Sequence, residues 1–327
     1  MGDEREARML LATVSEPADI ITGVLVDHVG VDETARLITS DGALPDEIDA
    51  AEGALWRRRL ASRLIPGELD RLHSEMDRHG IGMLVPGETE WPVELRRLGV
   101  SAPLALWFRG DPTRLRSPLP SRVSVVGSRA ATTYGTLIAG ELASDLVGDG
   151  RLIISGGAYG IDEAAHRAAN ATKPGHTIPV LAGGLDRPHP PALQETFERI
   201  VDHGGLLVSE LPPGSAPSRW RLLQRGRLIA ALSAATVVVE AGARSGALNI
   251  AGQAHALGRP VGVVPGPLTS PASAGNHSLI REGIGTLVTN AKDVAALIDP
   301  PDPFAVAPAF AYDPLRQRPA TAPGRTR

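Results

Sequence analysis

Several residue types are absent from this 327-residue chain or scarce in it. It has no cysteine, which excludes disulfides, zinc–thiolate sites and a cysteine nucleophile, and suits a reducing compartment. Aromatic residues make up only 3%, so the core must be built from Leu, Val, Ile and Ala. No apolar run approaches the ~18 residues of a membrane span, and the start MGDEREAR lacks the apolar segment of a signal peptide. These absences predict a soluble cytoplasmic protein that does not contact a membrane.

Strong net charge and the common catalytic motifs are missing too. The net charge is −4, so a surface for nucleic acid must be a local patch, and of 33 basic residues only Lys173 and Lys292 are lysines. The sequence contains no G-x-x-x-x-G-K-[ST], H-E-x-x-H or G-x-S-x-G, and its histidines do not cluster with carboxylates at ligand spacing. We therefore expect a protein that is not an enzyme, with no catalytic residue, no metal site and no cofactor.

The length favours about two domains at ~150 residues each, and composition divides the chain further. Residues 1–80 show helical periodicity, broken at Gly23, Gly30 and Gly42, and predict a small all-α domain. Residues 81–121 form a proline-containing connecting segment, in which the apolar run 104–108 predicts an edge strand. Residues 300–327 are rich in proline and are expected to be a disordered tail.

Residues 122–299 predict a doubly wound α/β domain. Short apolar runs without alternation recur at 123–126, 152–154, 178–181, 206–208, 236–239, 261–264 and 286–288. Helical spacing separates some of them, at 133–147, 162–170 and 247–257. Such strands are typical of a mainly parallel sheet covered on both faces, which binds ligands at the carboxyl ends of its strands.

Two glycine-bearing corners follow the first strands of this domain. The first contains Gly127, Ser128 and Arg129, where bare amides at a helix start and a guanidinium favour an anion. The second is Ser155-Gly156-Gly157-Ala158-Tyr159-Gly160, whose glycines are costly unless the backbone turns sharply or admits a ligand closely. We interpret the two corners as an anion cradle, although each could be only a tight turn. Asp162 is expected to cap the following helix.

Arginines gather before the apolar run 228–232. Arg219, Arg221, Arg225 and Arg227 fall where a helix is expected to start, and positive charge at that end favours a bound polyanion. Trp220 could stack on a base or pack under the loop. A further corner contains Arg244, Ser245 and Gly246, and Glu240 before it is expected to pair with Arg244 or Arg227. Residues 275–280 read as a polar loop that closes the sheet edge.

These corners, taken in order, resemble the DNA-processing DprA (Smf) family. The resemblance rests on Val126-Gly127-Ser128-Arg129, Ser155-Gly156-Gly157-Ala158-Tyr159-Gly160-Ile161-Asp162 and Arg225-Gly226-Arg227-Leu228-Ile229, and on residues 183–186, 209–210, 239–241, 245–246, 264–266 and 275–276. Together they cover about residues 110–290. Where the family often has Phe-Pro-x-Arg-Asn-Arg, this chain has Leu222-Leu223-Gln224-Arg225-Gly226-Arg227, which replaces an aromatic residue that could meet a base.

The resemblance implies an extended Rossmann-like domain that binds single-stranded DNA without sequence preference, after a sterile-alpha-motif-like helical module. It further implies a homodimer that protects incoming DNA and loads the recombinase RecA during natural transformation and homologous recombination. The short tail leaves no room for the winged helix of some members. The residues implied to bind DNA are Gly127, Ser128, Arg129, Ser155, Gly156, Gly157, Gly160, Arg219, Arg221, Arg225, Arg227, Arg244, Ser245 and Gly246.

Two other functions remain open at this point. Related Rossmann-like families hold a nucleoside monophosphate with similar corners, so the chain could be a nucleotide sensor or a phosphoribohydrolase-like enzyme, although their Pro-Gly-Gly-x-Gly-Thr motif is absent. A protein–protein scaffold whose arginines only support dimerisation is a further alternative, because arginine is common at interfaces.

Overall fold

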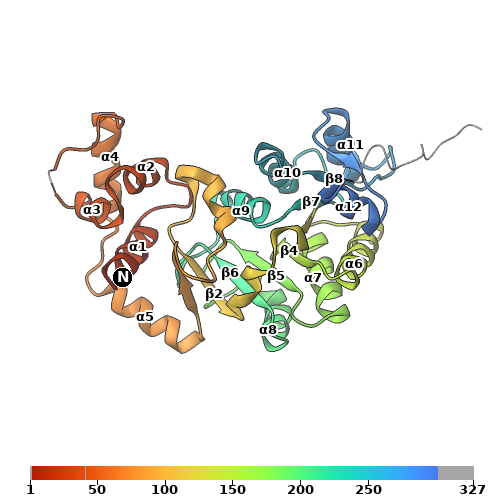
Figure 1. Ribbon diagram of the computed structural model, residues 1–327, viewed down its shortest axis with the longest axis horizontal. Coiled ribbons are helices and arrows are strands. Elements are labelled where there is room, and N and C mark those ends of the chain that lie inside the picture. Colours follow the sequence, from red (N-terminus) through yellow and green to blue (C-terminus); the bar gives the residue numbers. More distant parts are fainter. Residues whose placement is uncertain (1, 41, 301–327) are drawn as a thin grey trace, which may run out of the picture.

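The N-terminal part of the chain before the first strand consists of α-helices joined by loops (Figure 1). The computed structural model describes residues 2–40 and 42–300, so the predicted disordered tail, apart from its first residue, lies outside the described residues. The N-terminal helices are α1 (Gly2–Val14), α2 (Ile20–Val29), α3 (Val31–Leu37), α4 (Ala50–Ala61) and α5 (Glu68–His79). No helix in the described part of the chain has the length and hydropathy that crossing a bilayer requires.

A nine-stranded sheet follows, in the order β1-β2-β6-β5-β4-β3-β7-β8-β9. Its first two strands are antiparallel to their neighbours, and β6 to β9 form a parallel sheet. The strands are β1 (Gly82–Leu84), β2 (Leu106–Gly110), β3 (Arg122–Val126), β4 (Leu152–Gly156), β5 (Thr177–Leu181), β6 (Leu206–Ser209), β7 (Ala235–Val238), β8 (Val261–Val263) and β9 (Thr286–Leu287). Each apolar run predicted in the α/β domain is therefore a strand, and the predicted fold class is confirmed.

The prediction of an edge strand at residues 104–108 was wrong in its position. The strand β2 forms there but lies inside the sheet, because Trp107 pairs with Met83 of β1 on one side and with Ser209 of β6 on the other. The edge is β1, a three-residue strand too short to predict from the sequence. The segment 81–121 thus contributes two strands to the sheet, together with the 3₁₀ helix η1 (Val93–Ser101).

Helices cover both faces of the sheet, which explains why its strands are apolar without alternation. Val123 and Val125 of β3 pack against α6 (Thr133–Gly148) and α7 (Ile161–Thr172), whereas Val126 packs on the opposite side against α9 (Arg219–Ala231) and α10 (Gly246–Ala256). The helices α8 (Gln194–Asp202) and α12 (Ala291–Ile298) lie on the same side as α6 and α7.

The N-terminal helices are joined to the sheet through an apolar core. Leu72 and Met76 of α5 share a cluster with Met83 of β1 and Trp107 of β2. Gly23, predicted to break a helix, instead lies inside α2, where a Cβ would come within 1.8 Å of the Val100 carbonyl oxygen. The absence of a side chain therefore allows η1 to approach α2, and the helix continues through it.

The predicted polar loop at residues 275–280 is a helix, α11 (Ala274–Arg281). The side-chain nitrogen Nδ2 of Asn276 donates to the carbonyl oxygens of Val238, Val239 and Val264 at 3.2, 3.0 and 2.8 Å. The side chain of Asn276 is 1% exposed, so it ties the ends of β7 and β8 together from within the core.

Candidate functional site

A pocket lies where the carboxyl ends of β3, β4 and β5 meet the start of α9. It has a volume of about 70 Å³, and Arg129, Gly157 and Arg225 all line it. The two glycine-bearing corners and Arg225 thus meet at one rim of the sheet, the end at which a doubly wound α/β domain is expected to bind its ligand. The other lining residues are Ala158, Tyr159, Ala182, His189, Pro190, Pro217 and Leu222.

The corner after β3 is held by the end of the neighbouring strand β7. The Ser128 amide donates to the Glu240 carbonyl oxygen at 2.7 Å, and the amide and hydroxyl of Thr132 each donate to the Glu240 carboxylate at 2.8 Å. The prediction that Glu240 pairs with Arg244 or Arg227 was therefore wrong. Glu240 instead fixes the loop that carries Arg129, whose own side chain is exposed.

The corner after β4 has glycines because its surroundings leave no space for side chains. A Cβ on Gly156 would lie 2.5 Å from the Arg225 Nη2 atom and 2.6 Å from the Asp162 Oδ2 atom. Gly160 has a φ of +77°, and a Cβ there would lie 2.4 Å from the Ser128 carbonyl oxygen. The glycines thus allow the two corners and Arg225 to pack against one another. These contacts are made within the protein, so the close approach of a ligand stays a prediction.

Arg225 is a buried guanidinium with no hydrogen-bond or ion-pair partner among the described residues. It is 7% exposed, and its Nε atom is fully buried without an acceptor. Burial lowers the pKa of Arg225, Asp162 opposes this effect, and the positive charge of Arg129 adds to it. A buried cation in this condition is costly unless an anion compensates it. Because Arg225 also lines the pocket, its chemistry is that of an anion receptor.

Two buried titratable side chains, Asp162 and His166, lie near Arg225. Burial raises the pKa of the Asp162 carboxyl to about 6, against the lowering effect of Arg225. Burial lowers the pKa of His166 to about 4, and its ring contacts the Thr177 hydroxyl at 2.7 Å and the Gly156 carbonyl oxygen at 3.2 Å. The expectation that Asp162 caps α7 was wrong, because Gly160 is the N-cap residue and no side chain caps this helix end.

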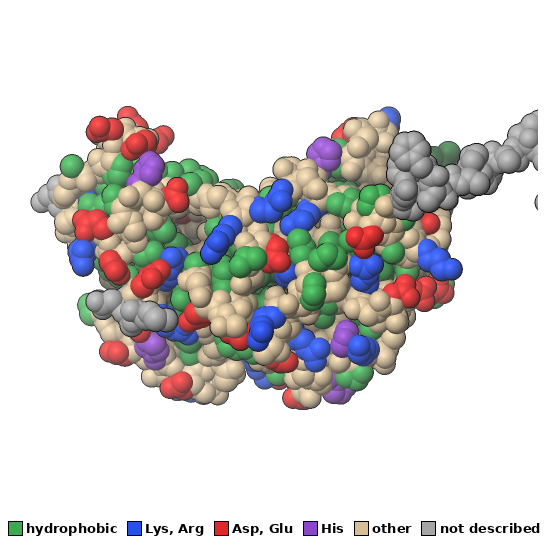
Figure 2. Space-filling model, viewed as in Figure 1, with side chains coloured by type: hydrophobic (Ala, Val, Ile, Leu, Met, Phe, Trp, Pro, Cys, Tyr) green, Lys and Arg blue, Asp and Glu red, His purple; other side chains and the backbone are tan. Residues whose placement is uncertain are grey.

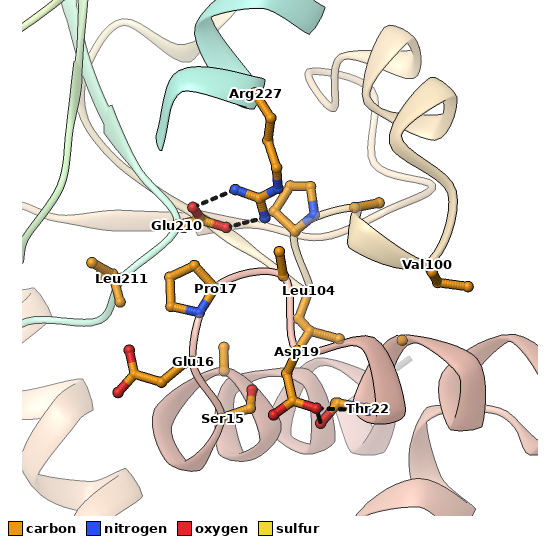
Figure 3. A pocket seen from close by; sticks show the side chains of 15 residues that line it. Ser15, Glu16, Pro17, Asp19, Thr22, Val100, Leu104, Glu210, Leu211 and Arg227 are labelled. Atoms are coloured by element: carbon orange, nitrogen blue, oxygen red, sulfur yellow. Dashed lines mark hydrogen bonds and ion pairs between the residues drawn. The ribbon is translucent and has the colours of Figure 1, made fainter. Parts of the chain in front are cut away.

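The side chain of Arg227, which was predicted to bind DNA, is hydrogen-bonded to other residues of the protein, among them Glu210 (Figure 3). It makes two hydrogen bonds to the Glu210 carboxylate, at 2.7 and 2.6 Å, and others to the carbonyl oxygens of Ser101 and Gln224 at 2.8 and 2.9 Å. Arg227 and Glu210 are 4% and 8% exposed. These bonds join α9 to β6 and η1, and they leave Arg227 a weaker candidate for a DNA contact than Arg225.

Two further predicted residues also make internal contacts. Arg221 holds both oxygens of Glu16, at 2.9 and 3.1 Å, and so links α9 to the segment between α1 and α2. Ser155 is fully buried, and its hydroxyl donates to the Val125 carbonyl oxygen at 2.6 Å. The Ser155 hydroxyl is therefore occupied within the protein, and a contact of Ser155 with DNA stays a prediction. Arg221 could contact DNA only by releasing Glu16.

The remaining predicted residues lie around the pocket rather than in it. Arg219 and Trp220, in the first turn of α9, are exposed, and Trp220 has 51% of its surface accessible. Arg244 is exposed and Ser245 caps α10 by accepting from the Ala247 amide at 3.3 Å. They follow β7, one strand further along the same rim, and Gly246 begins α10.

Sequence reasoning missed the apolar walls of the pocket. His189, Pro190 and Pro217 come from the long segments after β5 and β6, where no periodicity indicates which residues turn inward. Leu222 occupies the position at which the resemblance expected an aromatic residue. Tyr159, 44% exposed, is the pocket's one aromatic residue and was quoted only as part of the glycine corner.

The fold and the site together define a class: a doubly wound α/β protein with an arginine-lined anion pocket at the strand carboxyl ends. The described residues contain no group of His, Asp and Glu able to hold a metal ion. On the face shown in Figure 2, Asp and Glu side chains gather mainly on the N-terminal lobe at the left, whereas most Lys and Arg side chains lie over the middle and the right, with some acidic side chains among them.

Comparison with known proteins identifies the family. A family model described as DNA recombination-mediator protein A matches residues 82–299. The DNA processing protein DprA of Mycobacterium tuberculosis is 43% identical over 302 residues, covering 88% of this chain and 73% of the relative. That of Bacillus subtilis is 30% identical over 245 residues, covering 73% and 80%. The chain therefore belongs to the DprA family of DNA recombination mediators, and the resemblance is confirmed.

Solved structures agree with this assignment. The X-ray structure of DprA from Streptococcus pneumoniae superposes with a TM-score of 0.70 at 26% identity, covering 90% of this chain and 98% of that one. A structure of DNA processing protein A from Helicobacter pylori, described as revealing its single-stranded DNA binding mode, gives a TM-score of 0.59 at 28% identity, covering 66% and 94%.

Proposed function

We propose that this chain binds single-stranded DNA without sequence preference, with Arg225 and Arg129 at the backbone phosphates. The observation that carries the proposal is the unpaired, buried Arg225 guanidinium in an open pocket. An arginine fork matches the geometry of a phosphate, and charge-assisted bonds of this kind are the strong ones. The H. pylori relative, whose structure is described as a single-stranded DNA binding mode, supports this ligand.

The pocket walls fit the sugar and base rather than a second phosphate. Tyr159, Leu222 and Pro217 offer apolar surface beside the two arginines. Stacking on an aromatic side chain is tolerant of sequence because every base has a π-face, and it contributes about 1–3 kcal/mol per base. Double-stranded DNA keeps its bases stacked inside the helix, so a single strand should be preferred.

The experiment is fluorescence anisotropy with labelled single- and double-stranded oligonucleotides over a range of salt concentrations. Arg225→Met should weaken single-strand binding roughly ten- to hundredfold, since hydrogen bonds to charged groups contribute about 1.5–3 kcal/mol. The negative slope of log K against log[salt] should also become shallower by about 0.7, the value for one phosphate contact. Because Arg225 is buried and unpaired, the variant should keep or raise the melting temperature.

Arg199→Met is the matched control, because Arg199 lies on the exposed side of α8 and outside the pocket. It should leave affinity and slope unchanged. Unchanged binding by the Arg225 variant would remove the mechanism. Release of a base from a nucleoside monophosphate by the purified protein would instead favour the enzymatic alternative.

We further propose that the chain acts as a mediator without catalytic turnover, as a homodimer that protects DNA and loads RecA. The family assignment supports the mediator role. The titratable side chains that line the pocket are Arg129, Tyr159, His189 and Arg225. The wild-type protein should accelerate RecA assembly on single-stranded DNA, whereas the Arg225→Met variant should not. Light scattering should give a molecular mass twice that of one chain, as expected for the homodimer.

A further inference from the structure

A second group of arginines lies at the opposite end of the sheet from the pocket. Arg122 is the first residue of β3, and Arg259 lies two residues before β8, so both are at the amino ends of their strands. The 3₁₀ helix η1 supplies Glu94 and Arg97 to the same place, and the charges of these four groups act on one another. The pocket lies at the far end of β3, a strand of five residues that spans roughly 16 Å at about 3.3 Å per residue.

Several nitrogens in this group have no acceptor. Arg122 is 1% exposed and has one ion pair, from its Nη2 atom to the Glu94 Oε1 atom at 2.5 Å. Its Nε and Nη1 atoms, and the Nε atom of Arg259, are buried without a partner among the described residues. Arg97 is exposed and donates to the Leu257 carbonyl oxygen at 2.9 Å.

The charges in this group do not balance, since three guanidinium groups share one carboxylate. Burial lowers the pKa of Arg122, and Arg259 lowers it further against the opposing effect of Glu94. Burial also lowers the pKa of Arg259, and the charge of Arg97 adds to the effect. The pair of Arg227 and Glu210 shows the contrast, because there one cation meets one carboxylate and both its oxygens are used.

We propose that the cluster of Arg97, Arg122 and Arg259 is a second anion site, which binds a phosphate group. A phosphomonoester carries a charge of about −1.5 to −2 at pH 7, close to the excess of two positive charges, and a backbone phosphodiester, with a single negative charge, would compensate part of this excess. The guanidinium groups of Arg97 and Arg259 would bind the phosphate oxygens from the solvent side. The buried guanidinium of Arg122, oriented by Glu94, would add positive potential from the protein interior. The site is independent of the proposed DNA pocket because it shares no residue with it.

The phosphate could be free or part of a nucleic acid backbone, and the experiment separates these sources. Titration with inorganic phosphate at constant ionic strength, followed by calorimetry and by melting temperature, should show saturable binding to the wild-type chain. The double variant R97S/R259S should bind phosphate at least tenfold more weakly. It leaves the Arg122–Glu94 ion pair in place, so the fold should be kept, and circular dichroism checks this.

Arg199→Met provides the control, since Arg199 lies outside both the cluster and the pocket, and it should bind phosphate as the wild type does even if the proposed DNA function fails. Arg225→Met removes only phosphate bound in the pocket, so it should keep the binding that R97S/R259S loses. If R97S/R259S also makes the negative slope of log K against log[salt] for single-stranded DNA shallower by about 0.7, the ligand is a backbone phosphate. If the slope is unchanged, the ligand is a free phosphate. The proposal is overturned if phosphate binding does not saturate, if R97S/R259S binds it as tightly as the wild type, or if only Arg225→Met loses it.

Discussion

Arg225 and Arg227 lie two residues apart on α9, and their surroundings give them opposite roles. Arg227 meets Glu210 in a fully hydrogen-bonded pair, so its loss would leave a buried carboxylate without a partner, at a cost of about 3–5 kcal/mol. Arg225 has no such partner and opens to the pocket. Both were equally good candidates in the sequence, because spacing alone does not show which face of a helix meets a carboxylate supplied by another strand.

Gly156 controls where the Arg225 guanidinium can lie. In Gly156→Ala the new methyl group would overlap both Arg225 and Asp162, so the guanidinium must move away from its place in the pocket. We expect single-strand affinity to fall roughly tenfold and the free energy of unfolding to fall by about 1–3 kcal/mol. Anisotropy and urea denaturation measure the two effects.

Gly148→Ala is the matched control, since Gly148 ends α6 with open space around it. It should leave DNA binding unchanged. Wild-type affinity in Gly156→Ala would show that the position of Arg225 does not matter for binding.

Asp162 should make stability depend on pH. Because burial raises its pKa from 3.8 to about 6, the folded state holds the proton more tightly than the unfolded state. The stability from this group is present below pH 3.8, is lost as the pH rises through about 6, and amounts to ~3 kcal/mol. Asp162→Asn removes this dependence, so the variant should gain stability relative to the wild type between pH 4 and pH 7.

Urea denaturation at both pH values measures this difference. His166 acts in the opposite sense, since its stability is present above pH 6.5 and is lost as the pH falls through about 4, and it remains in both proteins. The comparison therefore isolates Asp162. A constant difference between the two proteins across this range would contradict the assignment.

At the scale of elements, α9 is positioned by contacts that its own sequence does not reveal. Arg221 binds Glu16, Arg63 approaches the same carboxylate at 3.3 Å, and Arg227 donates to the Ser101 carbonyl oxygen. These bonds connect the helix that carries Arg225 to the N-terminal helices and to η1. The N-terminal part of the chain therefore helps to orient the proposed DNA-binding helix.

The ion pair with Glu16 also keeps the Arg221 side chain from contacting DNA bound nearby. Glu16→Gln should release Arg221 and make the negative slope of log K against log[salt] steeper by up to about 0.7, the contribution of one more phosphate contact. Arg221→Ala should leave the slope at its wild-type value, because this side chain is paired in the free protein.

Glu33→Gln serves as the control for Glu16→Gln, since Glu33 pairs only with Arg36 on an exposed turn of α3. It should leave the slope unchanged. An equal slope for Glu16→Gln and Glu33→Gln would show that the Arg221 pair does not compete with DNA.

The sheet was predictable element by element because its strands are buried on both faces and stand out as apolar runs. The edge was not, since β1 has three residues and gains its place only by pairing with β2. The helix α11 was missed because its buried Asn276 reads as a loop residue until the strand ends that it bonds are known. The anion corners followed from glycine and arginine, whereas the partners of Glu240, Arg221 and Arg227 come from distant segments that spacing cannot locate.

At the scale of the whole molecule, the N-terminal helices and the sheet share one apolar core. Met9 of α1 and Leu72 of α5 lie in the same cluster as Trp107 of β2, and Phe197 of α8 lies there as well. The helices thus cover a part of the sheet that would otherwise expose large apolar side chains to water. Helices and sheet should therefore unfold together rather than as two independent units.

Leu72→Ala tests this coupling, because Leu72 is fully buried at the junction. The free energy of unfolding should fall by about 2–5 kcal/mol, as for other Leu→Ala changes in cores. Circular dichroism and tryptophan fluorescence should report one common transition at a lower urea concentration, since Trp56 reports on the helices and Trp107 on the sheet. Leu60→Ala, within the helical core, should shift the same transition by a similar amount. Two separate transitions, with only the helical one shifted, would show instead that the two parts fold independently and that the contact between them contributes little.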